Sequence, residues 1–354
     1  MPPLEPAVAV GARSFAFVCL TLALAGLAGF AAQGVHSPLP WMLGPLFAVA
    51  LLRMLAAPLR PLAGGRQAGQ WAIGTALGLY FTPAVLGLLT ANLLLVAVIA
   101  GGALLIGMLC ALVTARLTAE DRPTAFFASL PGGASEMAVV AERFGGAVDR
   151  IASAHALRVM LVVAVVPFGL SWVGAHGSDL YLPLASVVVP ARLPALVAVS
   201  LCGVGLLAAM RVGNAWVLGP LFGVGLVTGF GVSLSALPGW VVNGGQLLIG
   251  CALGCRFSPS FFRAAPWFLA AATVSALLAV ALGFLLALAA AAASSTPLAT
   301  LVLAAAPGGV SEMCITAKVL QLGVPLVTVC HVLRVVLLTL GAPALYRLFL
   351  RITD

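Results

Sequence analysis

The sequence predicts an all-α polytopic membrane protein made of two inverted-topology repeats, each with about five transmembrane helices plus one re-entrant or broken Pro-Gly-Gly helix. The 354 residues are 63% hydrophobic and 7% charged, whereas a soluble domain has about 25% charged residues. The segment PGGASEM at 131–137 recurs as PGGVSEM at 307–313, and the pattern of basic residues reverses between the halves. We therefore divide the chain into repeat 1, residues 1–176, and repeat 2, residues 177–354.

Each half contains six apolar segments, and stretches of about 20 such residues cross a bilayer as helices. In the first half they are residues 14–32, 38–54, 67–84, 91–115, 123–142 and 151–172. The second half repeats this order, since WMLGPLF at 41–47 recurs as WVLGPLF at 216–222 and Gln70 corresponds to Gln246. We interpret the first apolar segment as a span and not as a cleaved signal peptide.

The positions of the arginines predict the orientation of the two halves, because cytoplasmic connections are rich in basic residues. They follow the second and fourth segments of the first half, but the first, third and last of the second half. These residues are Arg53, Arg60, Arg66, Arg116 and Arg122, then Arg211, Arg256, Arg263, Arg347 and Arg351. The pattern places both termini in the cytoplasm and inverts the second half. Inversion needs an odd number of crossings per half, so one segment does not cross.

The Pro-Gly-Gly segment at 123–142 is the favoured exception, because charged residues flank it on both sides. As a re-entrant hairpin it keeps both charged clusters on the cytoplasmic side. Each arm of roughly eight to ten residues reaches roughly 12 to 15 Å, about the middle of the hydrocarbon core. The alternative is that this segment crosses as a broken helix and the short segment 67–84 does not cross. That alternative leaves Arg116 and Arg122 outside the cell.

The two Pro-Gly-Gly tips carry the candidate site. Pro and Gly end a helix, and Ser135 and Ser311 then occupy the place of an N-cap for the following helix. Two half-helix N-termini that meet near the midplane form an anion site in carriers. We therefore predict that a substrate binds between the tips. The predicted substrate-binding residues are Gly132, Gly133, Ser135, Glu136, Arg158, Gly308, Gly309, Ser311, Glu312 and Arg334.

Two of the nine acids, Glu136 and Glu312, lie deep in apolar sequence, and Arg158 and Arg334 are their expected counter-charges. The alternative is a pair of structural ion pairs that fasten each hairpin to a helix. If the tips converge, the four formal charges cancel. Two helix N-termini, each equivalent to roughly half a positive charge, then make the site lean positive.

Other polar residues leave two interpretations open. His155 and His331 are either members of a proton relay or buried neutral side chains bonded to a neighbour. Gln70 and Gln246 either line the cavity or form helix-packing hydrogen bonds. The Gly-Pro pairs in the 41–47 and 216–222 blocks indicate kinks for packing. The seven cysteines lie in apolar segments and are interpreted as buried thiols, not as metal ligands.

The two PGGxSEM copies, each followed by HxLR, resemble the AbrB-like family of duplicated integral membrane proteins over nearly the whole chain. Members carry labels such as AbrB family protein and putative ammonia monooxygenase. The family is also similar to inverted-repeat secondary carriers, which implies secondary transport. The residues support neither label at face value. A copper monooxygenase needs a cluster of His and acid ligands, and the chain shows no DNA-binding segment.

We therefore expect a secondary active transporter, and no enzyme, in the cell inner membrane as a multi-pass protein. Its expected partners are a small anionic or zwitterionic solute, H⁺ or Na⁺ as coupling ion, and the lipid bilayer. We expect no cofactor, no metal and no nucleic acid, and a homo-oligomer is left open. The alternatives are an AbrB-type regulator or sensor that affects gene expression indirectly, and a membrane-bound monooxygenase. The sequence names neither solute nor coupling ion.

Overall fold

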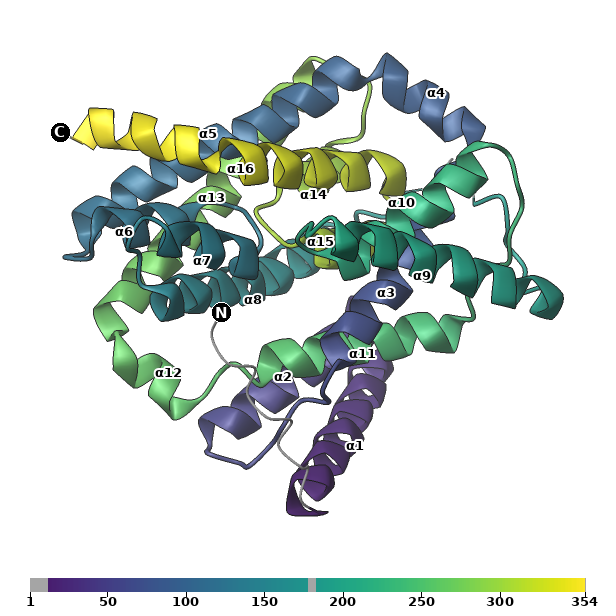
Figure 1. The fold of residues 1–354 in the computed structure, drawn as a ribbon, viewed down its shortest axis with the longest axis horizontal. Coiled ribbons are helices and arrows are strands. Elements are labelled where there is room, and N and C mark those ends of the chain that lie inside the picture. The colour runs from purple at the N-terminus through teal and green to yellow at the C-terminus, as the bar shows by residue number, and fades with distance from the viewer. Residues whose placement is uncertain (1–11, 178–182, 354) are drawn as a thin grey trace.

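The computed structural model describes residues 12–177 and 183–353, and all regular structure in these residues is helical (Figure 1). The same order of eight helices occurs twice. The first series is α1 (Ala12–Gly34), α2 (Pro40–Met54), α3 (Gly65–Gly78), α4 (Pro83–Ala91), α5 (Leu93–Leu117), α6 (Arg122–Ser129), α7 (Ala134–Glu142) and α8 (Val148–Trp172). After a 3-10 turn, η1 (Pro190–Arg192), the second series is α9 (Leu193–Ala209), α10 (Ala215–Gly229), α11 (Gly239–Gly254), α12 (Pro259–Ala264), α13 (Pro266–Ala292), α14 (Leu298–Ala305), α15 (Val310–Leu320) and α16 (Val324–Thr353).

The lengths of the helices confirm a polytopic membrane protein. Within the described residues, six helices are long and apolar enough to cross a bilayer: α1, α5, α8, α9, α13 and α16. Helices α2, α10 and α11 are shorter, with 15, 15 and 16 residues. The bent pair of α3 and α4 passes the same test when taken together.

The predicted helix at 67–84 is wrong at its C-terminal end. Helix α3 stops at Gly78, and α4 leaves it at an angle of 86°. Thr82 caps α4 by accepting a hydrogen bond from the amide of Val85 at 3.3 Å, and Pro83 occupies the first helical position, where its missing N–H is not needed. The corresponding Ser258 caps α12 in the same way. Helices α4 and α12 thus connect α3 and α11 to the next long helices.

The first Pro-Gly-Gly segment is a re-entrant hairpin, because its two ends lie at the same place. Thr124, in the first turn of α6, accepts a hydrogen bond from the amide of Ala147, which follows α7, at 2.7 Å. Next to it, Arg150 forms an ion pair with Glu120. The chain therefore enters and leaves this segment on one face, and the broken crossing helix is excluded for repeat 1.

The second hairpin also has its two ends together, through a close approach of Gly323 to Thr300, and its base lies on the opposite face. A Cβ on Gly323, which follows α15, would lie 2.7 Å from Cγ2 of Thr300 in the first turn of α14. Helix α8 begins beside the base of the first hairpin, and shortly after its end Gly177 donates to the carbonyl of Leu320 at the base of the second, at 3.1 Å. With 25 residues, α8 spans roughly 37 Å between the two bases. The hairpins thus enter from opposite faces.

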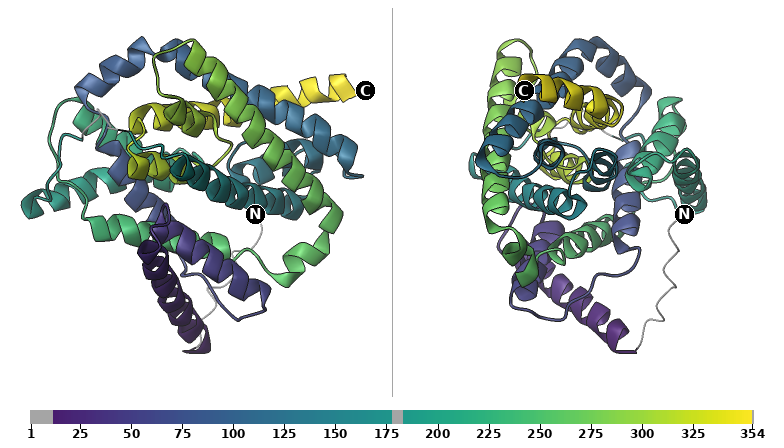
Figure 2. Two further views of the ribbon diagram at one scale, coloured as in Figure 1. Left: turned by 180° about the vertical axis from the view of Figure 1, so that it is seen from behind. Right: turned by 60° about the vertical axis from the view of Figure 1, so that its left-hand side comes forward.

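The helices form two bundles, and each bundle contains helices from both repeats (Figure 1). In the first, called here the scaffold bundle, α2 packs on α11 and α10 packs on α3, with α1 and α9 outside. In the second, the hairpin bundle, α5 packs on α16 and α13 packs on α8, and these enclose the hairpins α6–α7 and α14–α15. Figure 2 shows α13 crossing the hairpin bundle on the side away from the viewer of Figure 1.

The Gly-Pro pairs serve packing inside the scaffold bundle. A Cβ on Gly44 of α2 would lie 2.5 Å from the carbonyl oxygen of Ala28 in α1. A Cβ on Gly219 of α10 would lie 2.6 Å from Cα of Val204 in α9. Any larger side chain would separate these helix pairs, so close backbone approach explains the glycines.

Candidate functional site at the hairpin tips

Each hairpin tip is a four-residue break between two short helices. The first, residues 130–133, separates α6 from α7, and the second, residues 306–309, separates α14 from α15. The N-caps are Gly133 and Gly309, both with extended backbone, and neither helix has a side-chain cap. The expectation that Ser135 and Ser311 are N-caps is therefore wrong, since both are the second residue of their helix. The Ser135 side chain lies outside the described side chains.

Arg158 of α8 binds the first tip through its carbonyl groups. Its two terminal nitrogens donate to the carbonyl of Leu130 at 2.5 Å and to that of Gly132 at 3.1 Å. One turn earlier, Nε2 of His155 lies 2.9 Å from the carbonyl of Phe127, and Nη2 of Arg158 lies 3.0 Å from Nδ1 of His155. A carbonyl only accepts, so Nε2 carries the ring hydrogen and Nδ1 accepts from the arginine. His155 thus positions Arg158, and a neutral imidazole suffices.

The second tip repeats this arrangement. Arg334 of α16 donates to the carbonyl of Ala306 at 2.7 Å and to that of Gly308 at 2.5 Å. Nε2 of His331 lies 2.9 Å from the carbonyl of Leu303, while its Nδ1 is buried and has no hydrogen-bond partner in the described part of the chain. Arg158 and Arg334 are only 5% and 2% exposed. Both arginines satisfy carbonyls that the broken helices leave unpaired in the interior of the protein.

The expected pairing of Glu136 with Arg158 is not found. The structure places Oε1 of Glu136 2.6 Å from Nδ2 of Asn214, which donates to it from the start of α10. The carboxylate also lies against Gly133, and that of Glu312 lies against Gly309, so each acid folds back over the N-terminus of its own helix. Arg158 and Arg334 therefore compensate the negative C-terminal ends of α6 and α14. Glu136 and Glu312 compensate the positive N-terminal ends of α7 and α15.

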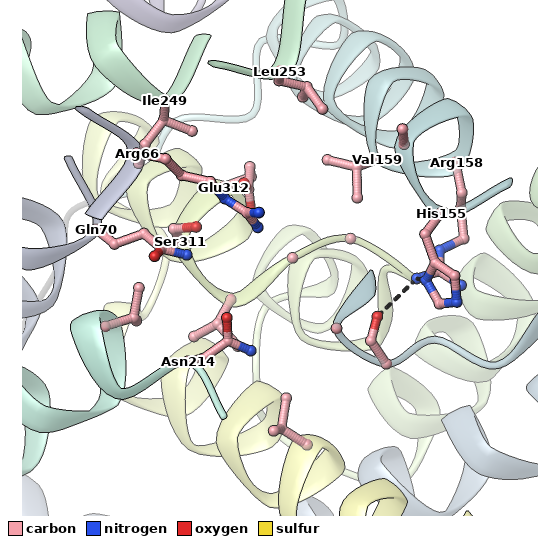
Figure 3. A pocket seen from close by; sticks show the side chains of 18 of the residues that line it. Arg66, Gln70, His155, Arg158, Val159, Asn214, Ile249, Leu253, Ser311 and Glu312 are labelled. Carbon is pink, nitrogen blue, oxygen red and sulfur yellow. Dashed lines mark hydrogen bonds between the residues drawn. The ribbon is translucent and has the colours of Figure 1, made fainter. Parts of the chain in front are cut away.

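A cavity of about 80 Å³ lies where the two tips meet the scaffold bundle (Figure 3). This is several times the roughly 10 to 15 Å³ that one water molecule needs on the same measure, so a small solute fits. The residues that line it are Arg66, Gln70, Pro131, Gly132, Gly133, His155, Ala156, Arg158, Val159, Asn214, Val217, Ile249, Ala252, Leu253, Arg256, Gly308, Gly309, Val310, Ser311, Glu312, Arg334 and Val335. Most predicted site residues thus come together, whereas Glu136 and His331, among the described side chains, are not lining residues.

Four polar lining residues, Arg66, Gln70, Asn214 and Arg256, are not among the predicted site residues, although one of the two interpretations of Gln70 places it in the cavity. Figure 3 shows Arg66, Gln70 and Glu312 on one side of the pocket and Arg158 on the other. With four arginines and one glutamate, the lining has a formal excess of three positive charges. The predicted set of four charges, Glu136, Glu312, Arg158 and Arg334, therefore lacks Arg66 and Arg256, and the lining is more positive than that set.

The fold and the site define a class of protein: a polytopic α-helical membrane protein whose duplicated, oppositely inserted hairpins meet at a basic cavity. A sequence model described as "Transition state regulatory protein AbrB" matches residues 41–350, and the chain belongs to this AbrB family. It is also similar to the uncharacterized protein YhjN of Bacillus subtilis (strain 168), with 26% identity over 351 residues, covering 92% of this chain and 91% of that protein. No solved structure matches the chain.

Proposed function

We propose that this protein is a secondary carrier for a small anionic solute, which binds in the cavity between the two hairpin tips. The observation that supports it most is the placement of four arginines around a cavity at the meeting point of two hairpins that enter from opposite faces. Fixed positive charge at such depth is costly unless it faces a cavity or a partner, and in membrane proteins it marks solute pathways.

The two bundles supply the moving parts of this mechanism. Solute binds between the hairpin bundle, which holds Arg158 and Arg334, and the scaffold bundle, which holds Arg66 and Gln70. Carriers of this construction expose a fixed site to each face in turn by moving one bundle against the other. Helices α4 and α12 link the bundles and are the expected hinges. Coupling to H⁺ or Na⁺ in the inner membrane, and the absence of an enzymatic reaction, are parts of the proposal.

The carrier proposal is preferred to a membrane oxygenase because the described residues bring together no group of three or more His, Cys, Asp or Glu side chains that could bind a metal ion. The name of the family model refers to a transition state regulator. A carrier affects gene expression when it changes the concentration of a regulatory solute, so an indirect regulatory effect is compatible with transport.

Reconstitution tests the proposal. The purified protein is first screened by thermal shift against small carboxylates and inorganic phosphate, and the stabilising solute is then followed as it enters proteoliposomes under an imposed pH or Na⁺ gradient. We expect uptake that saturates and depends on one gradient. Cysteine crosslinks between α3 and α15 are expected to stop uptake, whereas crosslinks between α1 and α2, within the scaffold bundle, are not. Uptake that is equal in empty liposomes contradicts the proposal.

A further inference from the structure

Arg66 and Arg256 are called here the scaffold arginines. They differ from the hairpin arginines, Arg158 and Arg334, whose side chains bind the carbonyls of the tips. Arg66 is the second residue of α3, and Arg256 lies two residues beyond the end of α11. Both line the cavity, and the charges that act most strongly on Arg256 are those of Arg66 and Glu312. Within the described residues, neither guanidinium has a carboxylate oxygen within 4.0 Å, and neither donates a hydrogen bond from its side chain.

The hairpin arginines are less available to a solute. The terminal nitrogens of Arg158 and Arg334 already donate to tip carbonyls at 2.5 to 3.1 Å, and both side chains are buried. Arg66 and Arg256 are partly exposed. A guanidinium with free N–H groups in a planar fork is the group that best matches a carboxylate or phosphate. The two scaffold arginines are therefore the ligands that the geometry offers to an anion.

Arg256 lies toward the face from which the first hairpin enters, and Arg66 lines the same cavity and acts on the charge of Arg256. Helix α11 leads through α12 to α13, and there Nε1 of Trp267 donates to the carbonyl of Leu117, the last residue of α5, at 2.7 Å. The first hairpin begins a few residues after Leu117. Since the partly exposed Arg256 is on this side and the buried Arg158 and Arg334 are at the tips, the more accessible end of the cavity is the one toward the face of the first hairpin.

The repeats do not reproduce this arginine pair. At the offset of 176 residues, the counterpart of Arg66 is Val242 and that of Arg256 is Tyr80, whereas Gln70 has Gln246 as its counterpart. When a carrier with inverted repeats opens to its other face, the equivalent positions of the opposite repeat line the opening. When the cavity opens to the face of the second hairpin, Val242 and Tyr80 therefore place no charge at these two positions.

We infer that the anion site is one-sided: Arg66 and Arg256 bind the carboxylate or phosphate group of the solute while the cavity is open to the face of the first hairpin, and binding is weaker from the other face. The inference rests on the proposed carrier function and adds to it the charge-recognising residues and the difference between the two faces. Inorganic phosphate and a small carboxylate such as succinate share the required chemistry, and the test separates them.

The first arm of the test measures binding of phosphate and of succinate to the detergent-solubilised protein by calorimetry. Arg66→Gln and Arg256→Gln are expected to weaken binding of the preferred anion about tenfold or more, and the double variant to abolish it. Arg60→Gln is the matched control, because Arg60 is exposed and donates to Ser14 outside the cavity. Unchanged melting temperatures exclude unfolding as the cause. Native-like binding by both variants overturns the inference, as does the absence of saturable binding of either anion to the native protein.

The second arm measures the half-saturating concentration from each face, in inside-out and right-side-out vesicles. We expect a lower value at the face of the first hairpin, and a smaller difference between the faces in the Arg66→Gln and Arg256→Gln single variants. Equal values in the native protein overturn the one-sided site. If binding depends on both arginines but neither anion is transported, the carrier function fails and the arginine site stands. If transport proceeds unchanged in both variants, the carrier function stands and this inference fails.

Discussion

The two repeats share their hairpins but differ in the charges around them. In both, a His-x-x-Arg pair on the last long helix binds the three equivalent hairpin carbonyls, at 2.5 to 3.1 Å. In contrast, Glu136 accepts from Asn214 while Glu312 lines the cavity. Arg66 and Arg256 have Val242 and Tyr80 as counterparts. The comparison teaches that the symmetric residues build the architecture, and that the asymmetric residues give the cavity its chemical character.

The largest expected effect is an all-or-none difference in thiol labelling between the two sides of the membrane, and it tests the inverted orientation of the two repeats. Ala119 lies before the first hairpin and Ser295 before the second, and both are exposed. In a variant without native cysteines, Ala119→Cys and Ser295→Cys are expected to react with an impermeant thiol reagent from opposite sides of the membrane. Positive charge predicts the Ala119 side to be cytoplasmic, together with both termini. Labelling of both positions from one side contradicts the inverted arrangement.

The next largest expected effect is a loss of stability, and it tests the two equivalent arginines that bind the hairpin tips. Replacing Arg158 or Arg334 by Gln leaves buried tip carbonyls without their donors, so each is expected to lower the free energy of unfolding by about 3 to 5 kcal/mol and to stop transport. Lys is expected not to restore stability, because one ammonium does not reproduce the planar fork. Thermal unfolding in detergent measures this. A large loss in one repeat and none in the other shows that the repeats are not equivalent here.

A smaller difference in unfolding free energy is expected between the two glycines at which the long helices α5 and α13 pass the hairpin tips. A Cβ on Gly107 of α5 would lie 2.6 Å from Cδ of Pro131, whereas one on Gly283 of α13 would lie 3.1 Å from the carbonyl of Ala305. Gly107→Ala is therefore expected to cost about 1 to 3 kcal/mol in unfolding free energy, and Gly283→Ala less. Gly101→Ala, on α5 with nothing within 4 Å, is the control and is expected to be neutral or stabilising. The reverse order contradicts the assigned contacts.

The smallest effects concern the glutamates. Glu312→Gln removes a negative charge from the cavity lining and is expected to tighten anion binding severalfold, by about 1 kcal/mol. Oε2 of Glu136 is buried and has no hydrogen-bond partner among the described residues, so it is the atom at which a coupled proton would bind. Glu136→Gln is therefore expected to preserve binding and to remove the pH dependence of transport. Anion binding and uptake between pH 5 and 8 measure both. Identical behaviour of the two variants contradicts the asymmetry.

The sequence predicted the duplicated elements because their signals are local. Hydropathy located the long helices, and the charges around Glu120 and Arg150 indicated a hairpin whose base the structure closes with that same ion pair. The bend after Gly78 was missed, although Thr82 followed by Pro83 is a helix-start signal. Hydropathy alone does not distinguish one interrupted apolar segment from two helices.

The site was harder to predict because partners were assigned by charge. Opposite charges indicated that Arg158 binds Glu136, but an unpaired carbonyl in the membrane also requires a donor, and only the fold shows which acceptor is in reach. Arg66 and Arg256 were missed for another reason. Neither arginine has a counterpart in the other repeat, so the duplication gives no signal for them, and their places beside apolar segments indicate only topology.

In the scaffold bundle, helices of one repeat pack on helices of the other repeat, and this has a consequence for biosynthesis. Helices α2 and α3 pack on α11 and α10, which leave the ribosome more than a hundred residues later. During translation, α2 and α3 enter the bilayer before their partners exist, and lipid or an insertion factor must cover their packing faces until then. The order of synthesis therefore delays completion of the basic cavity until the second half of the chain has been inserted, so an incomplete chain does not open an anion pathway through the membrane.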